Sequence, residues 1–185
     1  MNKVFTIGYA GVEVKRFIDV LKNNNISVLV DVRSLAKSQY FPVFNDVNIK
    51  KILIENGIEY FHLKSEFGAR QNDLQYYSNN VLDFEKFSQS EQFNNGINII
   101  KEKNINVCLM CAEIDPINCH RAILCSKHIA ESGLEVEHII LKRNGESLIE
   151  SNNDLENRLL QLYKTDDIEV AYKNQNQKIG HKLVK

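Results

Sequence analysis

The sequence has no long apolar run and almost no net charge. No stretch approaches the length of a membrane-spanning helix, and the first residues lack the layout of a signal peptide. We therefore expect a cytoplasmic protein with no membrane partner. The 185 residues carry a formal net charge of −1, which gives no long-range attraction to phosphate backbones, so we expect no bulk nucleic-acid binding. No internal repeat is present.

Cysteine is absent from most of the chain. All four cysteines, Cys108, Cys111, Cys119 and Cys125, lie between residues 108 and 125. A disulfide framework would join distant segments, which this clustering cannot do, so reduced thiols are expected. We expect Cys108 and Cys125 to belong to the core.

The apolar residues that are present alternate between strand-like and helix-like patterns. Hydrophobic residues make up 43% of the chain and charged residues 25%, which are ordinary values for a single globular domain. Strands are predicted over 4–9, 26–33, 58–63, 105–111 and 136–141, and helices over 11–25, 46–56, 83–104 and 119–132. This alternation predicts an α/β fold with three layers, in which a mostly parallel sheet of about five strands has helices on both faces.

The pattern divides the chain into an α/β domain over 1–145 and a C-terminal extension over 146–185. The extension is expected to hold a short helix over 155–163 and, from Lys164, a frayed or disordered tail rich in Asn, Gln and Lys. Residues 64–82 are polar and irregular, which favours a lid or binding loop whose aromatic side chains could stack on a flat ring, or a disordered segment. Those aromatic side chains are Phe67, Tyr76 and Tyr77.

Polar residues follow four of the predicted strands. The loops begin at Gly8, Asp31, His62 and Cys111. Because the carboxyl ends of parallel strands share one rim of a sheet, where ligands of such folds bind, these loops are predicted to meet.

One of these loops carries a dense motif. Residues 111–121 read Cys-Ala-Glu-Ile-Asp-Pro-Ile-Asn-Cys-His-Arg. The segment resembles the signature Cys-Ala-Glu-x-x-Pro-x-x-Cys-His-Arg of the domain of unknown function 488 family, and every fixed position matches. Shorter matches lie at 6–8, 31–34, 42–45 and 60–63.

The resemblance covers roughly residues 3 to 145 and implies an α/β fold with a site at the motif, without implying a particular reaction. One departure from the family pattern lies at Tyr9-Ala10, where many members have His-Ser at the corresponding positions.

The motif also has a physical reading. Cys119, His120 and Arg121 lie at the start of a predicted helix, where the partial positive charge of the helix terminus lowers the pKa of a thiol, so Cys119 is placed to be a thiolate. We expect Arg121 to bind an anion together with the helix terminus, in which case its removal would leave thermal stability unchanged or raise it. The alternative is that Glu113 or Asp115 pairs with Arg121 inside the protein and so holds the loop in place, as a loop staple. Cys111 is either a reactive thiol or simple strand-end packing.

The second and third strands supply further candidates. Asp31 and Arg33 are either a structural ion pair or substrate contacts. Tyr60 and His62 alternate with Phe61 and so share a face of their strand, from which they could contact a substrate.

These residues favour an enzyme acting on a small anionic substrate, such as a nucleotide or a phosphorylated metabolite. Cys111, Cys119, His120 and Glu113 would be the catalytic residues, and Arg33 and Arg121 would bind the anion together with Asp31, Tyr60 and His62. One alternative is a zinc or iron site built from Cys111, Cys119, His120 and His62, although the spacing differs from that of a structural zinc site. Another is a non-catalytic nucleotide-sensing module. We assign no cofactor and no metal.

Overall fold

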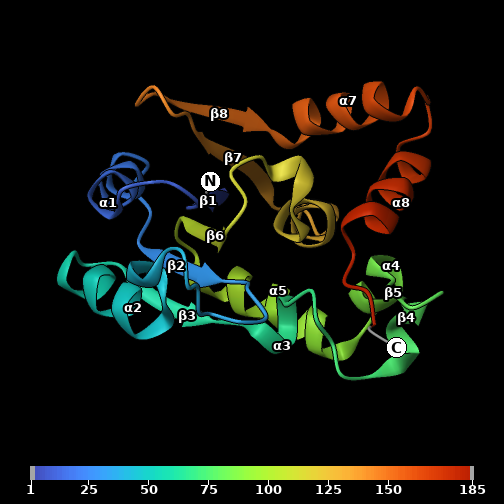
Figure 1. The fold of residues 1–185 in the computed structure, drawn as a ribbon, viewed down its shortest axis with the longest axis horizontal. Coiled ribbons are helices and arrows are strands. Elements are labelled where there is room, and N and C mark those ends of the chain that lie inside the picture. The colour runs from blue at the N-terminus through green and yellow to red at the C-terminus, as the bar shows by residue number, and fades with distance from the viewer. Residues whose placement is uncertain (1–2, 184–185) are drawn as a thin grey trace.

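A computed structural model of the protein describes residues 3–183 and centres on one six-stranded sheet (Figure 1). The strand order is β3-β2-β6-β1-β7-β8. The strands are β1 (Lys3–Gly8), β2 (Val28–Asp31), β3 (Glu59–His62), β6 (Val107–Cys111), β7 (Glu135–Leu141) and β8 (Ser147–Ser151). The first five pair in parallel, and β8 pairs antiparallel with β7.

The predicted α/β class and mostly parallel sheet are confirmed, and the strand count is six rather than about five. The sixth strand, β8, follows a tight turn at Asn144-Gly145 and forms a hairpin with β7. It lies at the sheet edge, where Leu148 and Ile149 are exposed, so it lacks the buried apolar signal of the inner strands.

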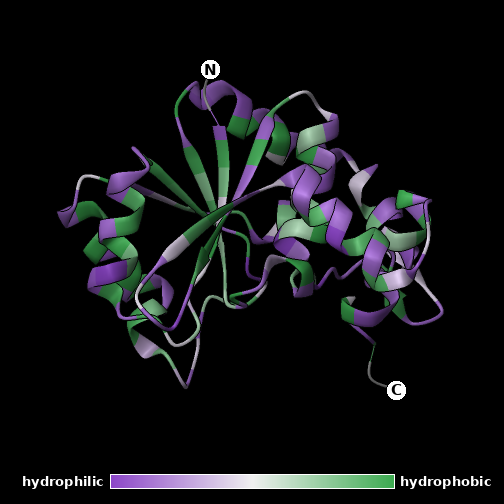
Figure 2. Ribbon diagram, turned by 90° about the horizontal axis from the view of Figure 1, so that it is seen from above, coloured by the Kyte–Doolittle hydropathy of each residue, from purple (hydrophilic) through white to green (hydrophobic). Residues whose placement is uncertain are grey.

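Helices cover both faces of the sheet, and Figure 2 shows the apolar strands between them. Helices α1 (Val14–Asn23) and α2 (Asp46–Glu55) enclose one apolar core with the sheet. The other core lies beneath α5 (Glu91–Lys103), the π-helical segment η4 (Arg121–Ser126) and α6 (Lys127–Glu131). Strands β2 and β6 are buried along their whole length, as expected for inner parallel strands.

Two predicted helices differ in detail from those observed. The segment 83–104 is two helices, α4 (Phe84–Ser88) and α5, because Ser90 caps α5 with a hydrogen bond accepted from the amide of Phe93. The helix predicted from Cys119 begins later, since Cys119 itself has an extended backbone.

Residues 64–82 are ordered, and the prediction of a lid with free aromatic rings is wrong. The segment holds α3 (Lys64–Phe67), a 3₁₀ turn η2 (Leu74–Tyr76) and a small hairpin, β4 (Tyr77–Ser78) with β5 (Val81–Leu82). Phe67 is fully buried against Phe93, and Tyr76 packs edge-on against Phe87. These rings belong to the core and its margin.

The predicted short helix in the extension is observed as α7 (Asn152–Tyr163), but the prediction of a frayed tail is wrong. Residues Ile168–Ile179 form helix α8, and residues 184–185 lie outside the described part of the chain. Asn176 is buried, donates to the carbonyl of Leu82 and accepts from the amide of Phe84. The polar composition of this segment was misleading because the side-chain amide of Asn176 bonds to backbone groups instead of water.

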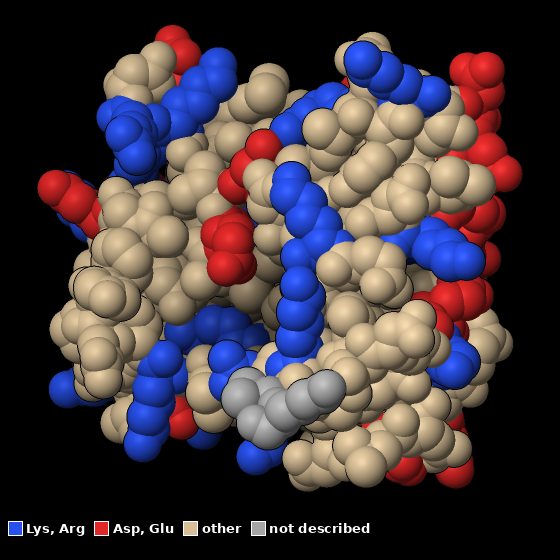
Figure 3. Space-filling model, turned by 45° about the vertical axis from the view of Figure 1, so that its right-hand side comes forward, with Lys and Arg blue, Asp and Glu red and all other residues tan. Residues whose placement is uncertain are grey.

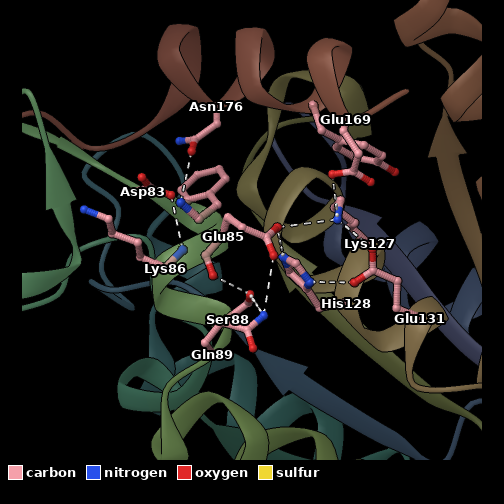
Figure 4. A network of polar contacts seen from close by, with 12 residues as sticks. Asp83, Glu85, Lys86, Ser88, Gln89, Lys127, His128, Glu131, Glu169 and Asn176 are labelled. Carbon is pink, nitrogen blue, oxygen red and sulfur yellow. Dashed lines mark hydrogen bonds and ion pairs between the residues drawn. The ribbon is translucent and has the colours of Figure 1, made fainter. Parts of the chain in front are cut away.

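Helix α8 is also held by a buried lysine (Figure 4). The Nζ of Lys127 lies 2.6 Å from Glu131 of its own helix, 3.3 Å from Glu169 of α8 and 3.6 Å from Glu85 of α4. It also lies 5.5 Å from the ring centroid of Tyr172. These contacts join three helices around a cavity of about 330 Å³.

The surface carries both signs of charge. On the face seen in Figure 3, basic side chains form an irregular band while acidic side chains gather along one edge. Among the helices of residues 3–183, none is long and apolar enough to cross a membrane.

Candidate functional site

The carboxyl ends of β1, β2, β3 and β6 meet at one rim, as predicted. Asp31 at the end of β2 pairs with His62 of β3 and with Met110 of β6, and Gly8 of β1 pairs with Cys111. The loops that follow these strands therefore lie side by side.

Gly8 allows the motif loop to cross closely over β1. A Cβ atom at Gly8 would lie 1.9 Å from the carbonyl oxygen of Glu113 and 2.9 Å from the Cα of Ile114. No side chain fits at these distances, so the loop can rest on β1 only at a glycine. The 3₁₀ turn η3 (Pro116–Asn118) then leads the chain into Cys119.

Two thiols and an imidazole meet where this loop ends. The Nδ1 of His120 lies 3.9 Å from the Sγ of Cys111 and 4.0 Å from the Sγ of Cys119. The Sγ of Cys111 lies 3.6 Å from Oε2 of Glu113. Both thiols are almost fully buried, while Glu113 is exposed. We call Cys111, Glu113, Cys119 and His120 the thiol cluster.

The orientation of His120 is set by the β2 loop. Its Nε2 lies 2.9 Å from the carbonyl oxygen of Val32, an acceptor only, so Nε2 carries a proton and Nδ1 faces the thiols. Burial disfavours the imidazolium, but the hydrogen bond and charge of Cys119 outweigh it and raise the pKa of His120. The imidazole is therefore placed to hold a second proton on Nδ1.

The two thiols differ in acidity. Burial opposes ionisation of Cys119, but a hydrogen bond from Cys111 and the charges of Arg121 and His120 hold its pKa well below the usual range. The pKa of Cys111 is raised, first by the hydrogen bond it gives to Cys119 and then by its own burial. The pair thus favours a thiolate at Cys119 beside a neutral thiol at Cys111.

Glu113 completes the cluster at its solvent side. Partial desolvation of the carboxyl, followed by the charge of Cys119, raises the pKa of Glu113. A carboxylate whose pKa lies nearer neutrality is suited to exchange protons with a thiol or a water molecule.

Arg121 is not placed to bind an anion from solvent. Its side chain is fully buried, and its guanidinium donates to the carbonyl oxygens of Glu113 and Ile114 and, over 3.3 Å, to Oγ1 of Thr6. The prediction that Arg121 binds an anion from solvent is therefore wrong. The alternative, in which Arg121 holds the loop in place, fits the structure, except that its partners are backbone carbonyls and not an acidic side chain. The charge of Arg121 still favours the thiolate of Cys119.

Asp31 and Arg33 form a buried ion pair. Nη2 of Arg33 lies 2.6 Å from Oδ2 of Asp31, and the same nitrogen donates to the carbonyl of Phe44. Nη1 of Arg33 donates to the hydroxyl of Tyr9, and the hydroxyl of Tyr60 donates to Asp31. Of the two readings, the structural ion pair is the one observed, since partners within the protein occupy these groups and both charges are buried.

His62 lies beside the same loop. Its Nε2 is 2.7 Å from the carbonyl oxygen of Arg33, and its side chain is partly buried. The donor atoms that fall within 4.8 Å of one another belong to Cys111, Cys119 and His120, so within residues 3–183 His62 does not join them as a fourth metal ligand.

Sequence reasoning missed the exposed basic residues of this rim. Lys64 is the second residue after β3, and Arg70 is held by a hydrogen bond from its amide to Oγ of Ser34, in the loop after β2. Both side chains are exposed. The position of Lys64 close to the end of β3 was the available signal, but the more conspicuous motif arginines drew the prediction instead.

Comparisons with known proteins place the chain in a family. No curated protein matches it. Two crystal structures, both of a protein from Shewanella putrefaciens CN-32 described as "Putative phosphatase (DUF442)", share 13% and 11% identity with it at a TM-score of 0.47. Each alignment covers 98% of this chain, and 88% and 91% of the other chains, respectively. A family model described as "Domain of unknown function DUF488" matches residues 13–127, which is more than half of the chain and includes the whole Cys111–Arg121 motif. The protein therefore belongs to the DUF488 family.

Proposed function

We propose that the protein is an enzyme in which the thiolate of Cys119 attacks a small anionic substrate. The observation that carries this proposal is the thiol cluster, in which a thiol of lowered pKa lies 4.0 Å from an imidazole of raised pKa. A thiolate beside an imidazolium is an activated nucleophile next to an acid, which is the minimum set for covalent catalysis.

Each member of the cluster has a part in such a reaction. Sγ of Cys119 forms a bond to the electrophilic atom of the substrate, the bond to the leaving group breaks, and Nδ1 of His120 gives the leaving group its proton. Glu113 then takes a proton from water, whose oxygen displaces Cys119 and releases the product. The thiol of Cys111 stabilises the Cys119 thiolate by hydrogen bonding before attack.

The preference for an anion rests on the charges around the rim. Arg121 is buried beneath it and contributes positive charge without direct contact, whereas Asp31 balances the charge of Arg33. Lys64 and Arg70, in the segment that follows β3, are exposed. Flexible exposed cations suit capture of a phosphate or carboxylate group. Because Cys119 is only 2% exposed, we expect a small reacting group at the end of the substrate to reach it.

Trapping of the covalent intermediate tests the proposal. The protein is mixed with a panel of phosphorylated metabolites, nucleotides and carboxylic thioesters, quenched in acid, and analysed by intact-protein mass spectrometry. We expect a substrate-derived mass on the peptide containing Cys119, absent in Cys119→Ser and retained in the matched control Cys125→Ser.

A second measurement tests the preference for an anionic substrate. In Lys64→Ala and Arg70→Ala we expect KM to rise with little change in kcat, because these residues would bind substrate without taking part in the reaction. Turnover that persists in Cys119→Ser would overturn the proposal, as would the absence of any adduct across the panel.

A further inference from the structure

We propose that Cys111 and Cys119 act as a redox pair, in which a small hydroperoxide oxidises Cys119 and Cys111 resolves the product as an intramolecular disulfide. The inference rests on the Cys119 thiolate of the proposed function. It adds a class of reactant and a role for Cys111 that substrate turnover does not require.

The position of the two sulfurs carries the inference. Both lie within 4.0 Å of the same nitrogen, Nδ1 of His120, and the three donor atoms fall within 4.8 Å of one another. A disulfide needs the sulfurs about 2 Å apart, so the pair has to close the remaining gap when the bond forms. Cys119 has an extended backbone between η3 and η4, and its amide and carbonyl bond to Pro116, Ala122 and Ile123, so the approach of the sulfurs falls to side-chain rotation.

The other two cysteines are separated from this pair by packing. Cys108 belongs to the core on the opposite face of the sheet, with α1 and α2. Cys125 lies in the same core as the pair, but its Sγ is directed to the carbonyl oxygen of Phe67, 3.7 Å away. Burial raises the pKa of both thiols, so neither is placed to react.

The chemistry balances in two steps. The thiolate of Cys119 attacks one oxygen of the hydroperoxide, the O–O bond breaks, an S–O bond forms, and the departing alkoxide or hydroxide takes the proton of His120. Cys119 is then a sulfenic acid. In the second step Cys111 loses its proton to Glu113, 3.6 Å away, and its sulfur attacks that of Cys119. The S–O bond breaks, and the leaving hydroxide takes up this proton and departs as water.

The burial of Cys111 and Cys119 limits the size of the oxidant that can reach them. Cys119 is 2% exposed and Cys111 is 5% exposed, with Glu113 at the opening. A molecule the size of hydrogen peroxide can reach such a sulfur, whereas a bulky disulfide would have to displace the loop. The same enclosure keeps the sulfenic acid close to Cys111 and away from other thiols.

Peptide mapping after peroxide treatment tests the inference. The reduced protein is exposed to a small molar excess of hydrogen peroxide, the remaining thiols are alkylated, and the digest is analysed without reductant. We expect a disulfide linking Cys111 to Cys119, reversed by dithiothreitol and still formed in the double control Cys108→Ser/Cys125→Ser. In Cys111→Ser we expect a sulfenic acid on Cys119 that reacts with dimedone, and in Cys119→Ser no oxidation of Cys111 at the same dose.

Folding of each variant is checked by thermal melting, and Cys111→Ala replaces Cys111→Ser if the hydroxyl is not tolerated. Conversion of wild-type Cys119 directly to sulfinic acid without linkage would overturn the inference, as would a disulfide to Cys125. Linkage without any substrate adduct would remove the proposed function and leave the redox pair. A substrate adduct on Cys119 without a disulfide would support the proposed function and overturn the redox pair.

Discussion

At the scale of single residues, Arg121 shows how one buried charge serves both structure and reactivity. Its guanidinium binds two carbonyl oxygens of the motif loop and the hydroxyl of Thr6, and its charge lowers the pKa of Cys119. The loop is therefore held in place by the same group that favours the thiolate.

We expect Arg121→Met to lower the free energy of unfolding by about 2 kcal/mol or more, because two buried carbonyls lose their donor at about 1–3 kcal/mol each. The pKa of Cys119 should rise in the same variant. Urea unfolding measures the first effect, with Arg143→Met as the control, since Arg143 is exposed and its loss should change stability by less than about 0.5 kcal/mol. Equal stability of the two variants would contradict the conclusion that Arg121 holds the motif loop in place.

Sequence reasoning found Arg121 but misjudged its task. The prediction assumed a helix terminus open to solvent, where an arginine needs an external anion. The partners that satisfy it come from β1 and from the loop crossing β1, and no local pattern reveals that crossing. The proximity of Cys119 and His120 was easier to predict, because the two residues are adjacent in the sequence and their side chains meet without a contact from a distant segment.

At the scale of elements, the motif loop depends on its contact with β1. Its backbone lies where a Cβ of residue 8 would be. We expect Gly8→Ala to lower the free energy of unfolding by about 3 kcal/mol, through displacement of a close-packed backbone. The matched control is Gly57→Ala, at a glycine of positive φ with open space around it, where backbone strain alone costs about 1–2 kcal/mol. Equal losses measured in urea would mean that the close contact is unimportant.

The inner strands were predictable and the peripheral elements were not. Strands β2 and β6 are uninterrupted buried runs, and a run of that kind has few other interpretations. Edge strand β8 and helix α8 hold their polar residues in contacts with distant segments. Gln175 of α8, for example, is fully buried and bonds to the carbonyl of Ile117 in the motif loop. Composition alone cannot distinguish such a glutamine from a solvated one.

At the scale of the whole molecule, a chain of polar contacts joins the motif to the C-terminal extension. Arg121 donates to Thr6, the hydroxyl of Thr6 lies 2.9 Å from Nδ1 of His138, and Nε2 of His138 lies 3.4 Å from Oδ1 of Asn152 in α7. The hydroxyl of Thr6 accepts from Arg121 and still has a proton to donate to Nδ1, while Nε2–H of the same ring can donate to Asn152, so both contacts fit a neutral His138.

Because His138 belongs to this series of contacts, the free energy of unfolding depends on pH. Burial, followed by the charge of Arg121, lowers the pKa of His138 to about 3, from 6.5 for a free histidine. A base with a lowered folded pKa binds one proton more when unfolded, so its contribution to stability is full above about pH 6.5 and is lost as the pH falls toward 3. The slope is about 1.4 kcal/mol per pH unit. Urea unfolding between pH 6 and 4 should show a shallower loss in His138→Gln than in the wild type, and parallel curves would contradict the assignment.

The central claim is that Cys119 is a thiolate at neutral pH, and the pH dependence of its alkylation tests that claim most directly. Burial slows iodoacetamide labelling at every pH but leaves the midpoint of the rate profile at the pKa of the thiol. Site-resolved mass spectrometry of the native protein should give Cys119 a midpoint well below the value of about 8.5 for a free thiol, with Cys108 and Cys125 unlabelled. A midpoint at or above 8.5, or equal labelling of all four cysteines, would contradict the account.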